Sequence, residues 1–238
     1  MNRKIVKLYD YRDEASNLHH QKVRYEPKSF AQRRPDGKGG WINNLEGIDP
    51  VLYKLPETIQ ANKDGKTIMY FEGEKDADNA TALDLAATTS GSAEGWRDEF
   101  TKYFLGAKVV IFPDNDKPGR RHADQVARSL YGIAKSIKII NLSGLPEKGD
   151  FSDWLAAGGT KEELLQLVAE TPEWEPQGLF DLLVICLSDV QSEEVSWLWE
   201  PYVPLGKLTL LEGDPQAGKT WVALAIAAAI TNGRGCGR

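Results

Sequence analysis

The sequence predicts an α/β protein built on a mostly parallel four-stranded sheet with flanking helices. Apolar runs at 67–71, 109–112 and 135–142 are the expected strands, and the clearest of them, 109–112, is short, β-branched and free of polar residues. Helix-forming segments at 77–86 and 120–131 follow the first two, and strands alternating with helices favour a parallel sheet. A small β-rich region precedes this sheet, and a strand, a loop and a helix follow it.

Composition and charge are those of a soluble globular protein of one or two domains. Hydrophobic residues make up 41% of the 238 residues and charged residues 27%. The net charge of −6 argues against a protein that coats nucleic acid along its whole length. Residues 1–56 nevertheless hold 11 Lys and Arg against 7 Asp and Glu, a net charge of +4, and the remainder carries −10. We therefore expect the front of the chain to contact phosphate groups.

Cysteine use and hydropathy predict a cytoplasmic protein. Cys186 and Cys236 lie far apart without a C-x-x-C pair, so the sequence supports neither a disulfide framework nor a zinc ribbon. The N-terminus lacks the apolar core of a signal peptide. The longest apolar stretch, 221–230, is far shorter than the ~20 residues of a membrane helix. No membrane partner is expected.

The N-terminal region, 1–60, reads as two β-hairpins and a short helix. Residues 4–11 and 18–25 alternate apolar with polar side chains around a polar turn. Residues 29–34 and 40–44 flank a Pro-Asp-Gly turn and predict the second hairpin. A helix over residues 52–61 is expected to lead into the parallel sheet.

Basic and aromatic side chains are interleaved along these hairpins. This combination suits single-stranded DNA, because cations hold the phosphates while rings stack on the bases. The alternative is a small β layer whose aromatics pack and whose charges are solvated. The residues concerned are Lys22, Arg24, Lys28, Arg33, Arg34, Lys38, Tyr25, Phe30 and Trp41.

Carboxylates follow each of the three predicted strands of the parallel sheet. The carboxyl ends of such strands share one edge, where open α/β sheets place their ligands. Several oxygens at one point suit Mg²⁺, which also keeps waters for substrate phosphates. A solvated acidic turn is the alternative for any one pair, and the convergence of three strand ends favours a metal site. The acids are Glu72 and Asp76, Asp114 and Asp116, and Asp150 and Asp153.

These acids lie in three ordered motifs. They are E-G-x-x-D from Glu72, D-x-D-x-x-G from Asp114 to Gly119, and the pair Gly149-Asp150. In order and spacing, residues 66–157 resemble the Toprim domain of bacterial replicative primases, topoisomerases and some nucleases, which is a Rossmann-like fold. The small-residue loop 90–93 also resembles one that primases carry after their second Toprim strand. Primases often have a last acid where this chain has Ser152, which leaves the role of Asp153 open.

The resemblance implies the roles of the site residues. Glu72, Asp114, Asp116 and Asp150 would hold Mg²⁺ and through it the phosphates of a nucleoside triphosphate. Glu72 would also act as a general acid or base, and Asp76 would complete the acidic cluster.

Other residues near these motifs are expected to be structural. Trp96 and Phe100 belong in the core beside a helix over 98–104, and a further helix over 164–170 ends before Pro172. We expect His19, His20 and His122 at the surface, without a metal.

The C-terminal part of the chain contains a phosphate-binding motif. Residues 213–220 match G-x-x-x-x-G-K-[ST] between an expected strand, 207–212, and a helix. Gly213 and Gly218 would let the loop backbone cradle the phosphates of ATP, Lys219 would reach the β- and γ-phosphates, and Thr220 would bind Mg²⁺.

This segment resembles the start of a RecA-like ATPase of the kind joined to Toprim domains in mobile-element primase-helicases. Because 18 residues follow Thr220, we expect a truncated domain with little ATPase activity alone. The expected organisation is a basic β-rich region, 1–60, a Toprim domain, 61–170, a linker, 171–196, and the ATPase segment, 197–238. The apolar patch 179–187 in the linker predicts either a strand or a short helix.

Three functions are compatible with these features. The leading one is a primase-like nucleotidyltransferase that acts on single-stranded DNA with Mg²⁺ and nucleoside triphosphates. A Toprim nuclease or topoisomerase is the second, although a topoisomerase needs a nucleophilic tyrosine on a separate DNA-gripping domain. The third is a non-catalytic DNA-binding module that docks a replicative helicase.

Overall fold

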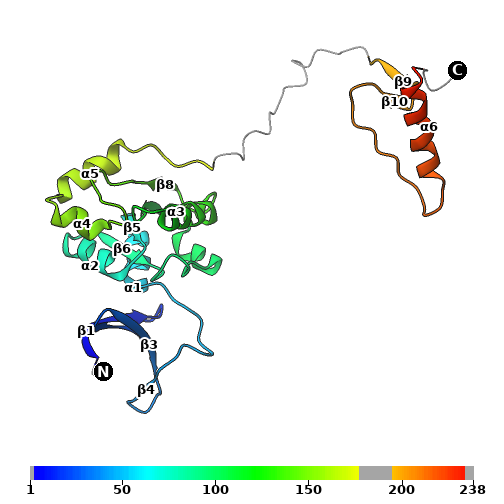
Figure 1. The fold of residues 1–238 in the computed structure, drawn as a ribbon. Helices are drawn as coiled ribbons and strands as arrows, with labels where there is room; N and C mark the ends of the chain where they lie inside the picture. The colour runs from blue at the N-terminus through cyan, green and yellow to red at the C-terminus, as the bar shows by residue number, and fades with distance from the viewer. Residues whose placement is uncertain (1–2, 177–194, 234–238) are drawn as a thin grey trace. The chain divides into compact units, whose positions relative to one another are not determined.

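The computed structural model describes residues 3–176 and 195–233 (Figure 1). The chain divides into two compact units, residues 1–179 and 180–238. In the described ranges, no helix is both long and apolar enough to cross a membrane. The domain boundaries expected from the sequence stay a prediction, and the apolar patch 179–187 lies outside the described residues.

The first unit begins with an antiparallel sheet of four strands in the order β1-β2-β3-β4 (Figure 1). The two expected hairpins join into one sheet because β2 also pairs with β3, Val23 lying opposite Ala31. Tyr9 and Tyr11 are buried on one face, and Val23, which lies opposite Leu8, is buried on the other. The strands are β1 Lys4–Arg12, β2 Leu18–Glu26, β3 Ser29–Pro35 and β4 Trp41–Ile42.

The second sheet is fully parallel, in the order β6-β5-β7-β8, and confirms the predicted α/β class. In its register Phe71 lies beside both Thr89 and Phe112, so three strands end at one level. Whatever follows these strands therefore begins at a common edge. The strands are β5 Thr67–Phe71, β6 Ala86–Thr89, β7 Lys108–Phe112 and β8 Ser136–Ile139.

Helices cover both faces of the parallel sheet because successive strand residues point to opposite sides. Ile68 and Tyr70 of β5 pack with α1, η1 and α3, whereas Met69 and Phe71 pack with α2, α4 and α5. Trp96 and Phe100 are buried in the first of these cores, as expected. The helices are α1 Leu55–Lys63, α2 Glu74–Ala82, the 3-10 helix η1 Asp98–Phe104, α3 Lys117–Leu130, α4 Phe151–Ala156 and α5 Lys161–Glu170.

Three expectations for the first unit were wrong. The helix predicted over 77–86 ends at Ala82, because Asp84 takes a left-handed conformation (φ 58°) and the chain then enters β6. His20 is buried and stacks on the Tyr11 ring, with centroids 4.2 Å apart. His122 is buried in α3, where its Nε2 lies 3.1 Å from the Tyr70 hydroxyl. Both imidazoles therefore belong to the core and not to the surface.

The second unit contains a short antiparallel pair, β9 Trp197–Trp199 and β10 Val203–Pro204, and the helix α6 Lys219–Thr231. The strand predicted over 207–212 was wrong. No strand of the described residues pairs with this segment, and Leu208 is almost fully exposed. A strand needs a partner for its backbone groups, so an apolar run alone does not form one.

Candidate active site

The structure places five of the predicted acids around the carboxyl ends of the parallel strands. Glu72 directly follows β5, and Asp114 comes two residues after the end of β7. Asp116 and Asp150 are the N-cap residues of α3 and α4, and Asp76 lies in the first turn of α2. The strand ends thus deliver all five side chains to one rim, which we call the acidic rim.

Burial and neighbouring negative charges raise the pKa of three members of the acidic rim. Burial raises the pKa of Asp114 to about 7, helped by the charges of Glu72, Asp76, Asp150 and Asp116. Burial also raises the pKa of Glu72, and the negative charges of Asp116 and Asp76 raise it further. Burial also raises the pKa of Asp76, to about 6. The rim therefore holds excess negative charge that a bound cation would relieve.

Two members of the rim keep free oxygens. Glu72 Oε2 is buried without a hydrogen-bond partner, and the Asp114 carboxylate accepts no hydrogen bond in the described part of the chain. Asp116 instead accepts from the Gly119 amide at 2.8 Å, and Asp150 accepts from the Asp153 amide at 2.8 Å. Glu72 and Asp114 are thus the carboxylates most available to a ligand.

The rim fits Mg²⁺ by donor type and charge, although it is not a ready-made cage. Within residues 3–176 and 195–233, no three His, Cys, Asp or Glu side chains are grouped closely enough to hold an ion by themselves. Mg²⁺ commonly binds through one or two carboxylates while waters and substrate phosphates fill its other positions. The free oxygens of Glu72 and Asp114 meet that requirement.

Asp76 joins α2 to α4. Its Oδ1 accepts a hydrogen bond from the Ser152 amide at 2.9 Å and another from the Ser152 hydroxyl. Asn79 donates to the same hydroxyl at 2.7 Å. Ser152, where primases often have an acid, is thus the hydrogen-bond partner of an acid, which sequence reasoning missed. Asp153 forms a reciprocal capping box with Asp150 at the start of α4.

A tight turn fixes the distance between the end of β7 and α3. A Cβ on Gly119 would lie 2.6 Å from the Asp114 carbonyl oxygen, so only glycine fits there. The Asn115 amide donates to the Gly149 carbonyl at 2.9 Å, and the Lys148 amide donates back to the Asn115 carbonyl at 3.0 Å. These bonds tie the second acidic motif to the third, Gly149-Asp150.

The antiparallel sheet carries part of the predicted basic and aromatic cluster at its surface. Arg33 lies over the Trp41 ring, with the guanidinium carbon 4.0 Å from the centroid, and both Phe30 and Trp41 are exposed. Lys22 lies 5.1 Å from the Phe30 ring but also forms an ion pair with Glu74 of α2, at 2.8 Å. Lys22 is therefore engaged by the protein itself.

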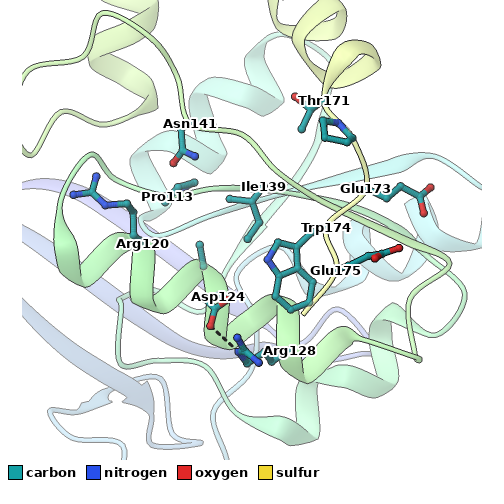
Figure 2. A pocket seen from close by; sticks show the side chains of 12 residues that line it. Pro113, Arg120, Asp124, Arg128, Ile139, Asn141, Thr171, Glu173, Trp174 and Glu175 are labelled. Carbon is teal, nitrogen blue, oxygen red and sulfur yellow. Dashed lines mark hydrogen bonds and ion pairs between the residues drawn. The ribbon is translucent and has the colours of Figure 1, made fainter. Parts of the chain in front are cut away.

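A cavity of about 680 Å³ lies between α3, β8 and residues 171–175 (Figure 2). Trp174 forms one wall, and its amide donates to the Ile137 carbonyl at 2.7 Å. Arg128 lies beside this indole and pairs with Asp124 at 2.7 Å (Figure 2). None of the five rim acids lines this cavity, so we do not assign the predicted chemistry to it.

The phosphate-binding motif of the second unit forms a loop that ends at α6. Gly218 has φ 80° directly before the helix, a conformation that favours glycine. The Lys219 ammonium donates to the carbonyls of Gly213 and Asp214, at 2.5 and 2.7 Å. Thr220 lies exposed in the first turn. The Lys219 ammonium is thus hydrogen-bonded to its own loop. A bound phosphate would have to displace these carbonyls to contact the ammonium.

Comparisons with known proteins find similarities for both parts of the chain. The model of a family described as an AAA domain matches residues 174–237. A search of curated proteins finds no match.

Among solved structures, the chain is similar to the zinc-binding and RNA polymerase domains of the Aquifex aeolicus primase. The identity is 18% and the TM-score 0.53, and the match covers 70% of this chain and 40% of that one. The DnaG catalytic core is similar with 16% identity and a TM-score of 0.52, over 70% and 53% of the two chains. A DNA primase domain from Pseudomonas aeruginosa has 20% identity and a TM-score of 0.51, over 70% and 51%. The chain thus shares the fold of primase catalytic cores and spans about half of their length.

Proposed function

We propose that the first unit is a primase-like nucleotidyltransferase that uses Mg²⁺ and nucleoside triphosphates on single-stranded DNA. One observation carries this proposal: four acids that follow three strands raise the pKa of Asp114 by their charge, on a fold shared with primase catalytic cores. The described part of the rim has one basic partner, the contact of 3.4 Å between Lys75 and Asp150. An acidic rim of this kind suits divalent cations that carry nucleotide phosphates.

Glu72 and Asp114 would hold Mg²⁺, with Asp116 and Asp150 beside them. Bound Mg²⁺ would neutralise charge on the phosphates of the incoming nucleotide. Glu72, whose pKa is raised, would accept the proton of a primer 3′-hydroxyl as that oxygen bonds to the α-phosphorus. The bond from that phosphorus to the bridging oxygen would break, and pyrophosphate would leave. Asp76, tied to Ser152, would keep α2 and α4 together and add its charge to the rim.

The antiparallel sheet would hold the DNA template. On one face of the sheet, the exposed ring of Trp41 offers a stacking platform and Arg33 beside it offers a cation for the phosphates. The exposed ring of Phe30 offers a platform on the other face. Interleaved rings and cations of this kind bind single strands with little sequence preference.

The second unit would bind ATP through its phosphate-binding loop, as part of an ATPase of the helicase type. The match to an AAA domain at residues 174–237 and the loop ending at α6 support this. We propose the domain organisation expected from the sequence, 1–60, 61–170, 171–196 and 197–238, and a replicative helicase or other replication proteins as partners.

One assay separates the candidate functions. The chain is incubated with Mg²⁺, single-stranded DNA and labelled nucleotides, and the products are resolved by length. Extension supports the nucleotidyltransferase, cleavage supports a Toprim nuclease, and binding with neither supports a DNA-binding module that docks a helicase.

The test variant is Asp114→Asn, in the rim. The matched control is Asp84→Asn: Asp84 is exposed, lies outside the rim, and has a left-handed backbone conformation that asparagine also adopts. Asp114→Asn should abolish extension and Asp84→Asn should leave it unchanged. Equal extension by the two variants would refute the assignment of the rim.

A further inference from the structure

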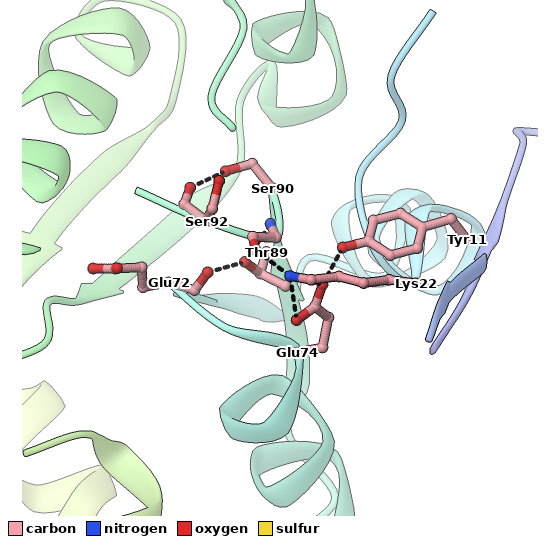
Figure 3. Close-up of polar contacts among 8 residues, drawn as sticks. Tyr11, Lys22, Glu72, Glu74, Thr89, Ser90 and Ser92 are labelled. Atoms are coloured by element: carbon pink, nitrogen blue, oxygen red, sulfur yellow. Dashed lines mark hydrogen bonds and ion pairs between the residues drawn. The ribbon is translucent and has the colours of Figure 1, made fainter. Parts of the chain in front are cut away.

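A largely buried ion pair connects the antiparallel sheet to α2, the helix that follows β5 of the parallel sheet (Figure 3). The Lys22 ammonium of β2 lies 2.8 Å from Glu74 Oε1 and 3.0 Å from Oε2, at the start of α2. The Tyr11 hydroxyl of β1 donates to Oε1 at 2.6 Å. Glu74 is only 4% exposed and Tyr11 3%. Both carboxylate oxygens are therefore satisfied by residues of the other sheet.

A chain of hydrogen bonds runs from this ion pair to the backbone of Glu72 (Figure 3). Lys22 also donates to the Gly91 carbonyl at 2.6 Å. The Gly91 amide donates to the Thr89 hydroxyl oxygen at 2.8 Å, and that hydroxyl donates to the Glu72 carbonyl at 2.8 Å. Thr89 is fully buried at the end of β6. Four residues from three separate stretches of the chain thus form one continuous path.

The loop after β6 is shaped to let this path form. Gly91 has φ +88°, and a Cβ there would lie 2.5 Å from the Tyr11 hydroxyl oxygen and 3.2 Å from Glu74 Oε1. Any larger residue would displace the loop from the ion pair. The position after Ser90 therefore needs glycine for both backbone conformation and space.

A buried ion pair of this kind does more for geometry than for net stability. The cost of desolvating two charges offsets most of their attraction, whereas removing one partner leaves the other charge buried and unpaired. In this junction the Lys22 ammonium has Glu74 and the Gly91 carbonyl as partners. The pair therefore sets one relative position of β2, α2 and the loop after β6.

We propose that Lys22, Glu74 and Thr89 are positioning residues for Glu72. Their hydrogen bonds hold the Glu72 backbone at the rim. The same bonds fix Glu72 relative to the antiparallel sheet, which would bind the DNA template. None of the three has to touch the reacting atoms. This inference rests on the proposed function for its catalytic consequence, and on the hydrogen bonds alone for its structural one.

The sharpest test compares Thr89→Val with Thr89→Ser. Valine keeps the shape and removes both hydroxyl bonds, to Glu72 and from Gly91. Small displacements of a catalytic group cost up to about 100-fold in rate, so kcat for extension should fall about 10-fold or more in Thr89→Val with a nearly unchanged KM for nucleotide. Serine keeps the hydroxyl and should restore kcat. An unchanged kcat in Thr89→Val, or an equal loss in Thr89→Ser, would overturn the proposal.

A second readout does not depend on activity. In Lys22→Met the loop loses the ammonium that binds the Gly91 carbonyl, and in Glu74→Gln that ammonium loses its counter-charge. Hydrogen exchange of the Gly91 amide should therefore accelerate about 10-fold or more in both variants. Lys161→Met is the control, since this partly exposed lysine of α5 lies outside the path. Exchange at Gly91 that is unchanged in both junction variants would overturn the proposal.

A third measurement separates failure of this inference from failure of the proposed function. If the wild-type chain extends no primer, the proposed function fails. The Mg²⁺-dependent rise in Tm then reports on Glu72 directly, because a displaced Glu72 binds the ion less well. The rise should be smaller in Thr89→Val than in the wild type and in Thr89→Ser. An equal rise in all three would overturn the positioning role.

Discussion

Asp114→Asn should stabilise the chain without metal and remove most of its stabilisation by Mg²⁺. The pKa of Asp114 is raised from its ordinary value of 3.8 to about 7 by burial and by the neighbouring acids. The folded state therefore binds a proton that the unfolded state has lost between these two pH values. Stability falls as pH rises through this window, and the loss is complete above pH 7. Asparagine carries no charge and removes this penalty.

The size of the effect follows from the shift. At about 1.36 kcal/mol per pKa unit, a shift from 3.8 to about 7 corresponds to roughly 4 kcal/mol. Asp114 is partly exposed, and water screens part of the repulsion, so we expect about 1–2 kcal/mol near pH 8. For a unit of this size that is a rise in Tm of about 2–8 °C.

Thermal unfolding followed by circular dichroism measures this difference. Without Mg²⁺, the variant should melt above the wild type near pH 8 and at nearly the same temperature well below pH 3.8, where Asp114 is protonated in both states. Added Mg²⁺ should raise the Tm of the wild type more than that of the variant. A wild type that Mg²⁺ does not stabilise, or a variant less stable than the wild type near pH 8, would refute the convergence of charge at the rim.

Three further changes test other parts of the structure. Ser152→Ala removes a hydrogen bond that lowers the pKa of Asp76, so the pKa of Asp76 should rise. The free energy of unfolding should fall by about 1–3 kcal/mol in a urea titration. Unchanged stability would contradict the proposed connection between α2 and α4. Trp41→Ala should weaken single-stranded DNA binding by about 1–3 kcal/mol in a fluorescence anisotropy titration, and unaltered affinity would exclude stacking on this ring. Lys219→Ala should abolish ATP binding, measured by calorimetry, and should leave primer extension intact. ATP binding that persists in this variant would contradict the assignment of residues 213–220 as the ATP-binding loop.

The parallel sheet was predictable because its strands are buried on both faces. The run 109–112 contains no polar residue, and burial alone explains that pattern. The strand β6, Ala86–Thr89, was hidden because its alanines also suit a helix, and only pairing with β5 makes it a strand. The segment 207–212 failed in the opposite way, since it has the composition of a strand without a partner among the described residues.

For the candidate site, the sequence predicted which acids would gather but not how each is used. Strand ends and motif spacing bring Glu72 and Asp114 to one edge, and both keep free oxygens. Asp116 caps α3 and Asp76 bonds to Ser152 from a distant segment. Such partners depend on tertiary contacts that local patterns do not contain. The buried position of His122 was missed for the same reason, because its partner, Tyr70, lies on β5.

The close approach of Gly119 to the Asp114 carbonyl has a consequence for sequence variation. A Cβ at this position would push the backbone of Asp114, and with it the free carboxylate of the rim. In a saturation-mutagenesis library selected for extension, position 119 should return glycine alone. The neighbouring Pro118 is exposed and should accept many residues. Tolerance at one position and none at the next would map the spacing of the turn without any structure determination.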